Sequence, residues 1–325
     1  MFNAAFIGLF FNVKSFRCKV IPVFVISLST IFSIGVFSQT RAVDSLKSVL
    51  NQHDQDDTLK VRILNELSNQ CKWVDFYASQ RYAEQALNLS RAFHFEIGFA
   101  IADYRLAQCY WALGDNDLAI ERGLEAAEIA ERKHFKSILG ESYTILARSY
   151  IDQVGFAKAK EYLVPAEQIA LQTKNWDLLS RVYNLSGVLL LVKDSNDSAL
   201  MLYHKTLDII KKDPSSKSLL SVIKLNIGEC YLSLQKPELA LKNFDEALSI
   251  SKAEETRNIY SEAIATSKIG RLLVTKGNYK EAERFLLEGL KLSRLSGVKR
   301  ALRYPYAGLL ELKTEQGKTA EALAY

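Results

Sequence analysis

The stretch GDNDLAIERGLEAAEIA, residues 114–130, returns in altered form four more times along the chain. The aligned copies are GFAKAKEYLVPAEQIA (155–170), SNDSALMLYHKTLDII (195–210), KPELALKNFDEALSI (236–250) and GNYKEAERFLLEGLKL (277–292). One small residue recurs at the same place, at Ser79, Ala119, Ala159, Ala199, Ala240, Ala282 and Ala322, with spacings of 40, 40, 40, 41, 42 and 40 residues. A fixed period of this length is typical of a solenoid, in which each unit packs on its neighbours.

Further positions follow the same period. Small residues stand twelve places before the recurring residue, at Ala107, Ala147, Gly187, Gly228 and Gly270. Large residues stand nine places before it, at Tyr110, Tyr150, Leu190, Tyr231 and Leu273. We interpret each unit as two antiparallel helices whose small residues let the backbones approach, while the aromatic or leucine side chain fills the space beside them.

These positions resemble tetratricopeptide repeats. The resemblance rests on sets such as Leu106-Ala107, Tyr110, Gly114-Asp115 and Ala119, and on Ile227-Gly228, Tyr231, Ala240 and Phe244. Two features depart from the usual pattern, because the proline that closes each repeat is absent and the period is near 40 rather than about 34. The longer period is similar to that of the repeats in kinesin light chains and in bacterial regulatory sensors.

The expected fold is all-α, a right-handed superhelical solenoid. A short leading helix is predicted at about residues 43–50 within a segment 39–57, and the solenoid spans 58–325 with about seven repeats, the last incomplete. The predicted helix pairs cover residues 58–92, 96–132, 136–172, 176–212, 216–252, 257–294 and 298–325. The composition agrees, since 5 Pro and 15 Gly in 325 residues favour long helices with short connections.

The N-terminus is predicted to be an export signal or a membrane anchor, covering residues 1–38. Basic residues Lys14, Arg17 and Lys19 precede an apolar run at 20–37, and Val36 and Ser38 are small residues suited to cleavage before Gln39. The run is also long enough to span a membrane uncleaved, and a buried helix of the folded body is the third reading. Under the first two readings the repeats lie outside the cytoplasm, periplasmic or anchored to the inner membrane.

Charge and cysteine content exclude several classes of function. The formal net charge is +5, and it falls to +2 (5 − 3) when the three basic residues before the apolar run are removed with a cleaved signal. A body so close to neutral has no field that would attract nucleic acid, so none is expected as a partner. Outside the N-terminal segment, Cys71, Cys109 and Cys230 form no metal-binding spacing and are predicted to be small core residues.

No catalytic or cofactor-binding motif is present. The four histidines, His53, His94, His134 and His204, stand apart from one another and from the cysteines, so no metal site is predicted. Phosphate-binding loops, nucleophile elbows and zinc-protease motifs are missing from the sequence. We therefore expect this chain to be no enzyme and to hold no cofactor.

Binding is predicted on the inner wall of the superhelix, which the first helix of each repeat lines. By register, the residues facing this groove are Tyr104, Gln108, Trp111, Thr144, Arg148, Asn184, Val188, Asn226, Glu229, Ser267 and Arg271. Arg148 and Arg271 are the candidates for holding an acidic group of a partner, and Tyr104 with Trp111 for an apolar anchor. The competing interpretation is that these residues pack between helices or are simply exposed.

The order of the segments resembles the extracytoplasmic sensor region of bacterial histidine kinases and regulators that carry such repeats. That resemblance implies a protein or peptide ligand in the groove, an output domain beyond residue 325, and membrane attachment through residues 20–37 or a later helix. The second helix of the seventh repeat stops at Tyr325, which we read as the edge of a longer protein. The alternative function is a free-standing periplasmic scaffold that assembles other proteins.

Overall fold

The computed structural model describes residues 37–72, 75–253, 257–323 and 325, and within these ranges the regular structure is entirely helical. The predicted export segment, residues 1–38, lies almost wholly outside the described residues. In the described part of the chain, no helix is both long and apolar enough to cross a membrane.

The helices alternate between first and second members of a pair. The leading helix is α2 (Phe37–Gln52), which covers the predicted helix at 43–50. The pairs are α3 (Thr58–Cys71) with α4 (Phe76–Ala92), α5 (Glu96–Leu113) with α6 (Asn116–Arg132), α7 (Lys136–Asp152) with α8 (Phe156–Thr173), α9 (Trp176–Val192) with α10 (Asn196–Lys212), α11 (Leu220–Ser233) with α12 (Pro237–Lys252), α13 (Ile259–Thr275) with α14 (Tyr279–Ser296), and α15 (Arg303–Glu315) with α16 (Thr319–Ala322). Two 3-10 turns, η1 (Pro214–Leu219) and η3 (Lys299–Leu302), precede α11 and α15. The predicted pairs are confirmed.

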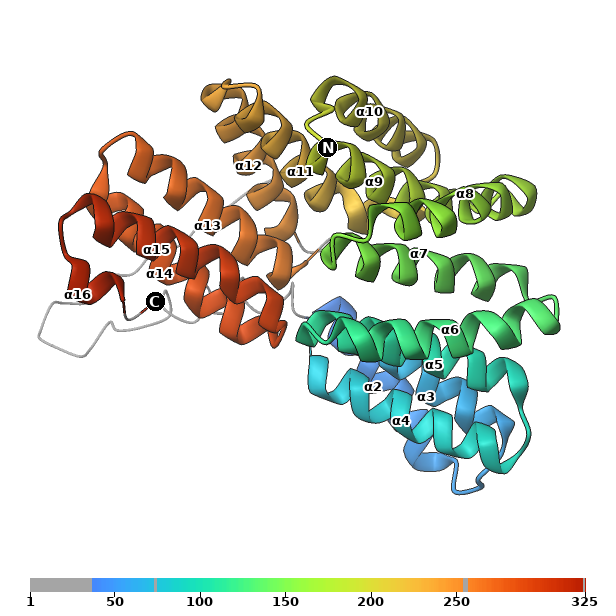
Figure 1. The fold of residues 1–325 in the computed structure, drawn as a ribbon. Helices are drawn as coiled ribbons and strands as arrows, with labels where there is room; N and C mark the ends of the chain where they lie inside the picture. Colours follow the sequence, from blue (N-terminus) through green and yellow to red (C-terminus); the bar gives the residue numbers. More distant parts are fainter. Residues whose placement is uncertain (1–36, 73–74, 254–256, 324) are drawn as a thin grey trace, which may run out of the picture.

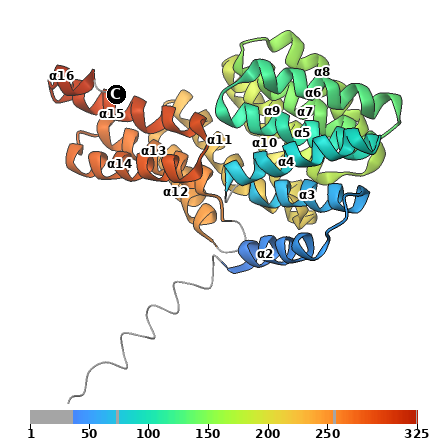
Figure 2. The same cartoon turned by 90° about the horizontal axis from the view of Figure 1, so that it is seen from below.

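Successive pairs follow one another along a curved path, from α3 and α4 at one end to α15 and α16 at the other (Figure 1). Each helix packs mainly on the helices before and after it, and each first helix also touches the first helix of the next repeat. Seen from below, the C-terminal helices α12 to α16 lie to one side of the N-terminal helices (Figure 2), and the turn η3 packs on α5. The chain is therefore a superhelical solenoid.

The packing within a repeat depends on small residues facing large ones. The recurring alanines are buried, and Ala119, Ala159, Ala199 and Ala240 have no exposed surface. In the fourth, fifth and sixth pairs, the large residue four places after the recurring alanine (Tyr203, Phe244 and Leu286) meets the small glycine of the first helix. A Cβ atom added to Gly187 would lie 2.5 Å from the Tyr203 ring, so only glycine leaves room for it. The large residue that fills the space thus comes from the second helix, in addition to the one predicted on the first.

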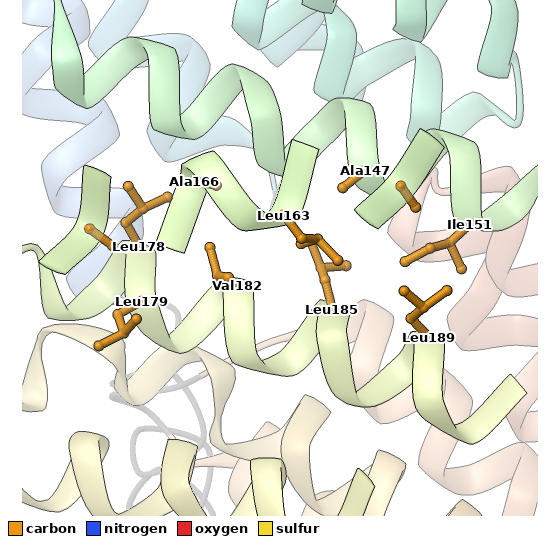
Figure 3. Packing of buried hydrophobic residues seen from close by; sticks show 11 residues of the cluster. Ala147, Ile151, Leu163, Ala166, Leu178, Leu179, Val182, Leu185 and Leu189 are labelled. Carbon is orange, nitrogen blue, oxygen red and sulfur yellow. The ribbon is translucent and has the colours of Figure 1, made fainter. Parts of the chain in front are cut away.

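Neighbouring repeats share their cores. One cluster joins Ala147 and Ile151 of α7, Leu163 of α8, and Val182 and Leu185 of α9, all of them buried. Figure 3 shows these side chains converging from the three helices. Because each helix pair leaves an apolar face for the next, stability is distributed along the array rather than held in one centre.

The cysteines behave as predicted. Cys71, Cys109 and Cys230 are buried and free, and burial raises the pKa of the Cys109 and Cys230 thiols to about 11. A thiol with so high a pKa stays protonated and unreactive at neutral pH. His94 and His134, by contrast, are exposed at the turns between repeats, where both have positive φ.

Candidate functional site

The concave side of the solenoid holds a cavity of about 750 Å³. Its described lining comes from α3, α5, α7, α9, α11, α13 and α15, or from the residues that lead into or out of these helices. The second helices contribute nothing to this lining. As predicted, the first helices form the inner wall of the solenoid, and the second helices lie on its outer side.

Beside the cavity, the turn η3 packs on α5 and joins the start of the seventh repeat to the N-terminal repeats. The Arg300 guanidinium donates hydrogen bonds to the Trp111 carbonyl oxygen at 2.6 Å and to Asn116 Oδ1 at 2.8 Å. It also lies 2.6 Å from Asp152 Oδ2. Beside it, Val298 is buried in a cluster with Phe76 and Trp111. The start of the seventh repeat is thereby fastened to repeats one to three (Figure 1).

Most of the predicted groove residues meet in this cavity. Eight of the eleven line it, namely Tyr104, Gln108, Trp111, Thr144, Arg148, Asn184, Val188 and Asn226. Glu229, Ser267 and Arg271 do not line it. Whether the eight bind a ligand stays a prediction, and the structure shows only that they line the same cavity.

The three residues outside the cavity have partners inside the protein. Lys268 Nζ lies 2.5 Å from Glu229 Oε1. Arg271 forms a bidentate ion pair with Glu311, in which Nε lies 3.0 Å from Oε2. Ser267 is buried and donates to the Ala263 carbonyl oxygen of its own helix. Arg271, one of the two predicted acid-binding residues, thus already holds a carboxylate of its own chain.

A charged network that the sequence reasoning missed lies in the wall between repeats two, three and four. Arg181 of α9 binds Glu141 of α7 through both guanidinium Nη atoms and lies 2.5 Å from Asp177 Oδ2. The Tyr104 hydroxyl donates to Glu141 Oε2 at 2.6 Å. Burial alone would raise the pKa of Glu141, but the Arg181 charge and the Tyr104 hydrogen bond outweigh it and hold this pKa below its ordinary value. Glu141 is therefore ionised and fully engaged at neutral pH.

The repeat period contained a signal for this network. Glu141 and Arg181 are 40 residues apart and so occupy the same place in adjacent repeats. The same separation joins Arg271 to Glu311, and a separation of 42 joins Asn184 to Asn226 through their amides at 2.8 Å. Opposite charges one period apart predict pairing between neighbouring first helices, because equal places on those helices lie side by side.

Arg148 lines the cavity, and no described residue accepts a hydrogen bond from it. Its guanidinium carbon lies 4.6 Å from the centre of the Trp111 ring, and Arg300 lies over the same ring at 5.0 Å. The indole Nε1 donates to Asp152 Oδ2 at 2.6 Å, which fixes the ring. Burial lowers the pKa of Arg148, although the group stays charged at neutral pH. The stacking holds this cation at the cavity wall without satisfying its N–H groups.

The described residues do not bring together three His, Cys, Asp or Glu side chains able to hold a metal ion. The cavity lining combines cationic, acidic, amide and apolar groups, and its carboxylates are engaged by other residues of the chain. Such a surface can bind a ligand that has both an acidic group and apolar side chains.

The comparisons with known proteins agree with the fold. A family model described as tetratricopeptide repeat matches residues 219–295, which hold most of the fifth and sixth helix pairs. This matched segment, and the stacked helix pairs of the rest of the described chain, are similar to tetratricopeptide repeats. A search of curated proteins with this sequence found no match.

Several solved structures share this fold. A Rap protein complexed with competence and sporulation factor is similar at a TM-score of 0.67 and 14% identity, over 92% of this chain and 84% of that chain. NprR in complex with its cognate peptide NprX is similar at 0.66 and 13% identity, over 92% and 87%. The apo form of RapI is similar at 0.57 and 16% identity, over 88% and 97%. At these identities the likeness concerns the fold.

Proposed function

We propose that this chain binds a short peptide in the cavity enclosed by its first helices. The observation that carries the proposal is the cavity itself, whose volume of about 750 Å³ is of the size that proteins use for small ligands. Two structures with this fold are described as complexes, one with competence and sporulation factor and one with a cognate peptide. The proposed role is binding, without catalysis by this chain.

The size of the cavity favours a peptide over a folded partner. Arg300 and Val298 join the seventh repeat to the N-terminal repeats, and the concave side offers a cavity of about 750 Å³, which a short peptide fits better than a folded domain. A scaffold that assembles whole proteins would need an accessible concave face or a large outer patch. We therefore place the scaffold function second.

Filling the cavity is expected to abolish peptide binding. Val188 lines the cavity, so Val188→Trp places an indole where the ligand would lie and should weaken binding by about tenfold or more. The matched control is Val192→Trp, because Val192 ends the same helix but is 51% exposed and does not line the cavity. The probe is a pool of short synthetic peptides incubated with the full chain, with retained peptides identified by mass spectrometry.

Hydrogen exchange gives a second readout for retained peptides. A ligand that touches several first helices should slow amide exchange along α5, α7, α9, α11 and α13, because solenoid repeats otherwise move cheaply relative to one another. Retention of no peptide by the unmodified protein, or equal retention by Val188→Trp, would contradict the proposed function.

We further propose that the binding module is exported and serves as the sensor part of a bacterial signalling protein. The support is the sequence order, with Lys14, Arg17 and Lys19 ahead of an apolar run at 20–37 and the repeats following it. The full chain expressed in a bacterial host is expected in the periplasm or on the outer side of the inner membrane, where protease added to spheroplasts would digest it. Protection from that protease in intact spheroplasts, with digestion after lysis, would rule out export.

A further inference from the structure

The feature that extends the proposed function is the unsatisfied guanidinium of Arg148. This group carries five N–H donors, and among the described residues none accepts a hydrogen bond from it. It lines both the main cavity and a smaller adjoining cavity of about 50 Å³. The half-buried guanidinium therefore faces the cavity, where an anion of a ligand can supply the acceptor that the described chain does not.

The repeat register shows what is missing. Arg148 and Arg271 stand at the same place in their repeats, each directly after the small residue of the first helix, Ala147 or Gly270. One repeat beyond Arg271, the same place is Glu311, which pairs with it. One repeat beyond Arg148, the same place is Val188, which has no charge. The chain therefore supplies a carboxylate to one of these arginines and leaves the other without one.

Two other basic side chains lie at the smaller cavity beside Arg148. Lys72 and Arg105 line the smaller cavity together with Arg148. Arg105 reaches the Gln108 amide at 3.1 Å through one guanidinium nitrogen, but its buried Nε has no acceptor. Burial, with the charges of Arg105 and Arg181, lowers the pKa of Lys72 to about 7. Two guanidinium groups, and a lysine that is about half protonated at neutral pH, therefore line the smaller cavity.

The acidic groups of the cavity are engaged elsewhere. Asp177 and Glu141 bind Arg181, and Asp152 binds Arg300. Glu66 accepts from the Gln70 amide at 2.6 Å. None of these carboxylates lies within ion-pair distance of Arg148, so a negative group from a ligand meets no competing internal partner.

We infer that the bound peptide presents a carboxylate to Arg148, and that Arg105 adds a second donor to it. This inference rests on the proposed peptide-binding function and names the chemistry of the ligand. The apolar faces of Trp111 and Ile145 beside the arginines exclude water, which strengthens a charge-assisted hydrogen bond. The carboxylate comes either from the C-terminus of the peptide or from an Asp or Glu side chain.

The probe is a pool of short synthetic peptides with free C-termini, matched by a second pool with amidated C-termini and a third lacking Asp and Glu. The unmodified protein is expected to enrich peptides that carry a carboxylate, and removal of that carboxylate should weaken binding by about tenfold or more. Loss after amidation assigns the C-terminal carboxylate, and loss after Asp and Glu are removed assigns a side chain.

The variant Arg148→Gln tests the residue itself. It keeps a polar side chain but removes the charge. It should weaken binding of the enriched peptides by about tenfold or more, while binding of the same peptides without the assigned carboxylate should be nearly unchanged. The matched control is Arg271→Gln, which loses the same charge at the same register outside the cavity. Circular dichroism melting of both variants checks that they fold, and Arg148→Lys should recover part of the affinity.

Two outcomes separate this inference from the proposed function. If peptides are retained without regard to their carboxylates, or if folded Arg148→Gln binds them as well as the unmodified protein does, the inference is wrong and the peptide-binding function stands. If no peptide is retained at all, the proposed function fails and the inference fails with it.

Discussion

Replacing Gly228 by leucine is expected to unfold the fifth repeat, with a loss of about 3 kcal/mol or more in the free energy of unfolding. A Cβ atom at this position would lie 2.3 Å from Cε1 and 2.7 Å from Cδ1 of Phe244, whose side chain is completely buried. No rotamer of leucine avoids this contact, because the clash already begins at Cβ. Since α11 and α12 share their core with α13, the disturbance should extend into the sixth repeat.

Gly228→Ala gives a graded form of the same test. In an open helix this change stabilises by about 1 kcal/mol, because alanine has the higher helix propensity. Here we expect the opposite sign, a loss of about 1–3 kcal/mol, since the added methyl group meets the Phe244 ring. Denaturation followed by circular dichroism measures the loss, and hydrogen exchange locates it, because a repeat array does not unfold as one unit.

The double variant Gly228→Ala with Phe244→Leu is the control. A smaller side chain on α12 makes room for the methyl group, so the two losses should be less than additive by about 1 kcal/mol. Ser233→Ala, at the exposed end of the same helix, should leave stability almost unchanged. A Gly228→Ala variant as stable as the unmodified protein would show that the small-to-large contact does not hold the pair together.

The repeat period made the fold predictable because it records local geometry. Each small residue marks where two helices touch, and Ala119 or Ala159 could be assigned to that contact without any knowledge of distant residues. The same register placed Tyr104, Arg148 and Asn184 on the inner wall, where the structure has them. Local packing and helix periodicity are sufficient for these positions.

The pairing of Arg271 was missed for a different reason. Because Arg271 faces inward, it was predicted to be free to bind an acidic group of a partner. Glu311 stands one period away and could have been recognised as its partner within the chain. Arg148 has no such partner, because the equivalent position in the next repeat is Val188, which carries no charge. A search for opposite charges one period apart would have separated the two arginines from the sequence alone.

The closure of the ring could not have been predicted from the sequence. Arg300 reaches Trp111 across 189 residues, and that encounter depends on the small rotation between successive repeats added over six units. The repeat period gives only the number of residues per repeat, and it contains no information on the rotation between successive repeats. Whether the seventh repeat returns to the second is therefore a property of the whole solenoid.

Arg300→Ala is expected to open the ring. The change removes the hydrogen bonds to the Trp111 carbonyl oxygen and to Asn116, and it leaves Asp152, whose side chain is 20% exposed, without its cationic partner. A partly buried carboxylate that loses its partner costs about 2 kcal/mol here, below the range for fully buried pairs because water reaches it. Small-angle X-ray scattering should then give a larger radius of gyration.

Lys299→Ala is the matched control for Arg300→Ala, since Lys299 belongs to the same 3-10 turn but is exposed. It should change neither the radius of gyration nor the stability. Asp152→Asn should weaken the same fastening, and the double variant with Arg300→Ala should lose little more than either single variant, because both changes break one interaction. An open ring should also release retained peptides faster, since Arg300 lies over the Trp111 ring, which lines the cavity next to Arg148. If Arg300→Ala leaves the radius of gyration and the peptide release rate unchanged, Val298 and its apolar neighbours hold the ring closed without the ionic contacts.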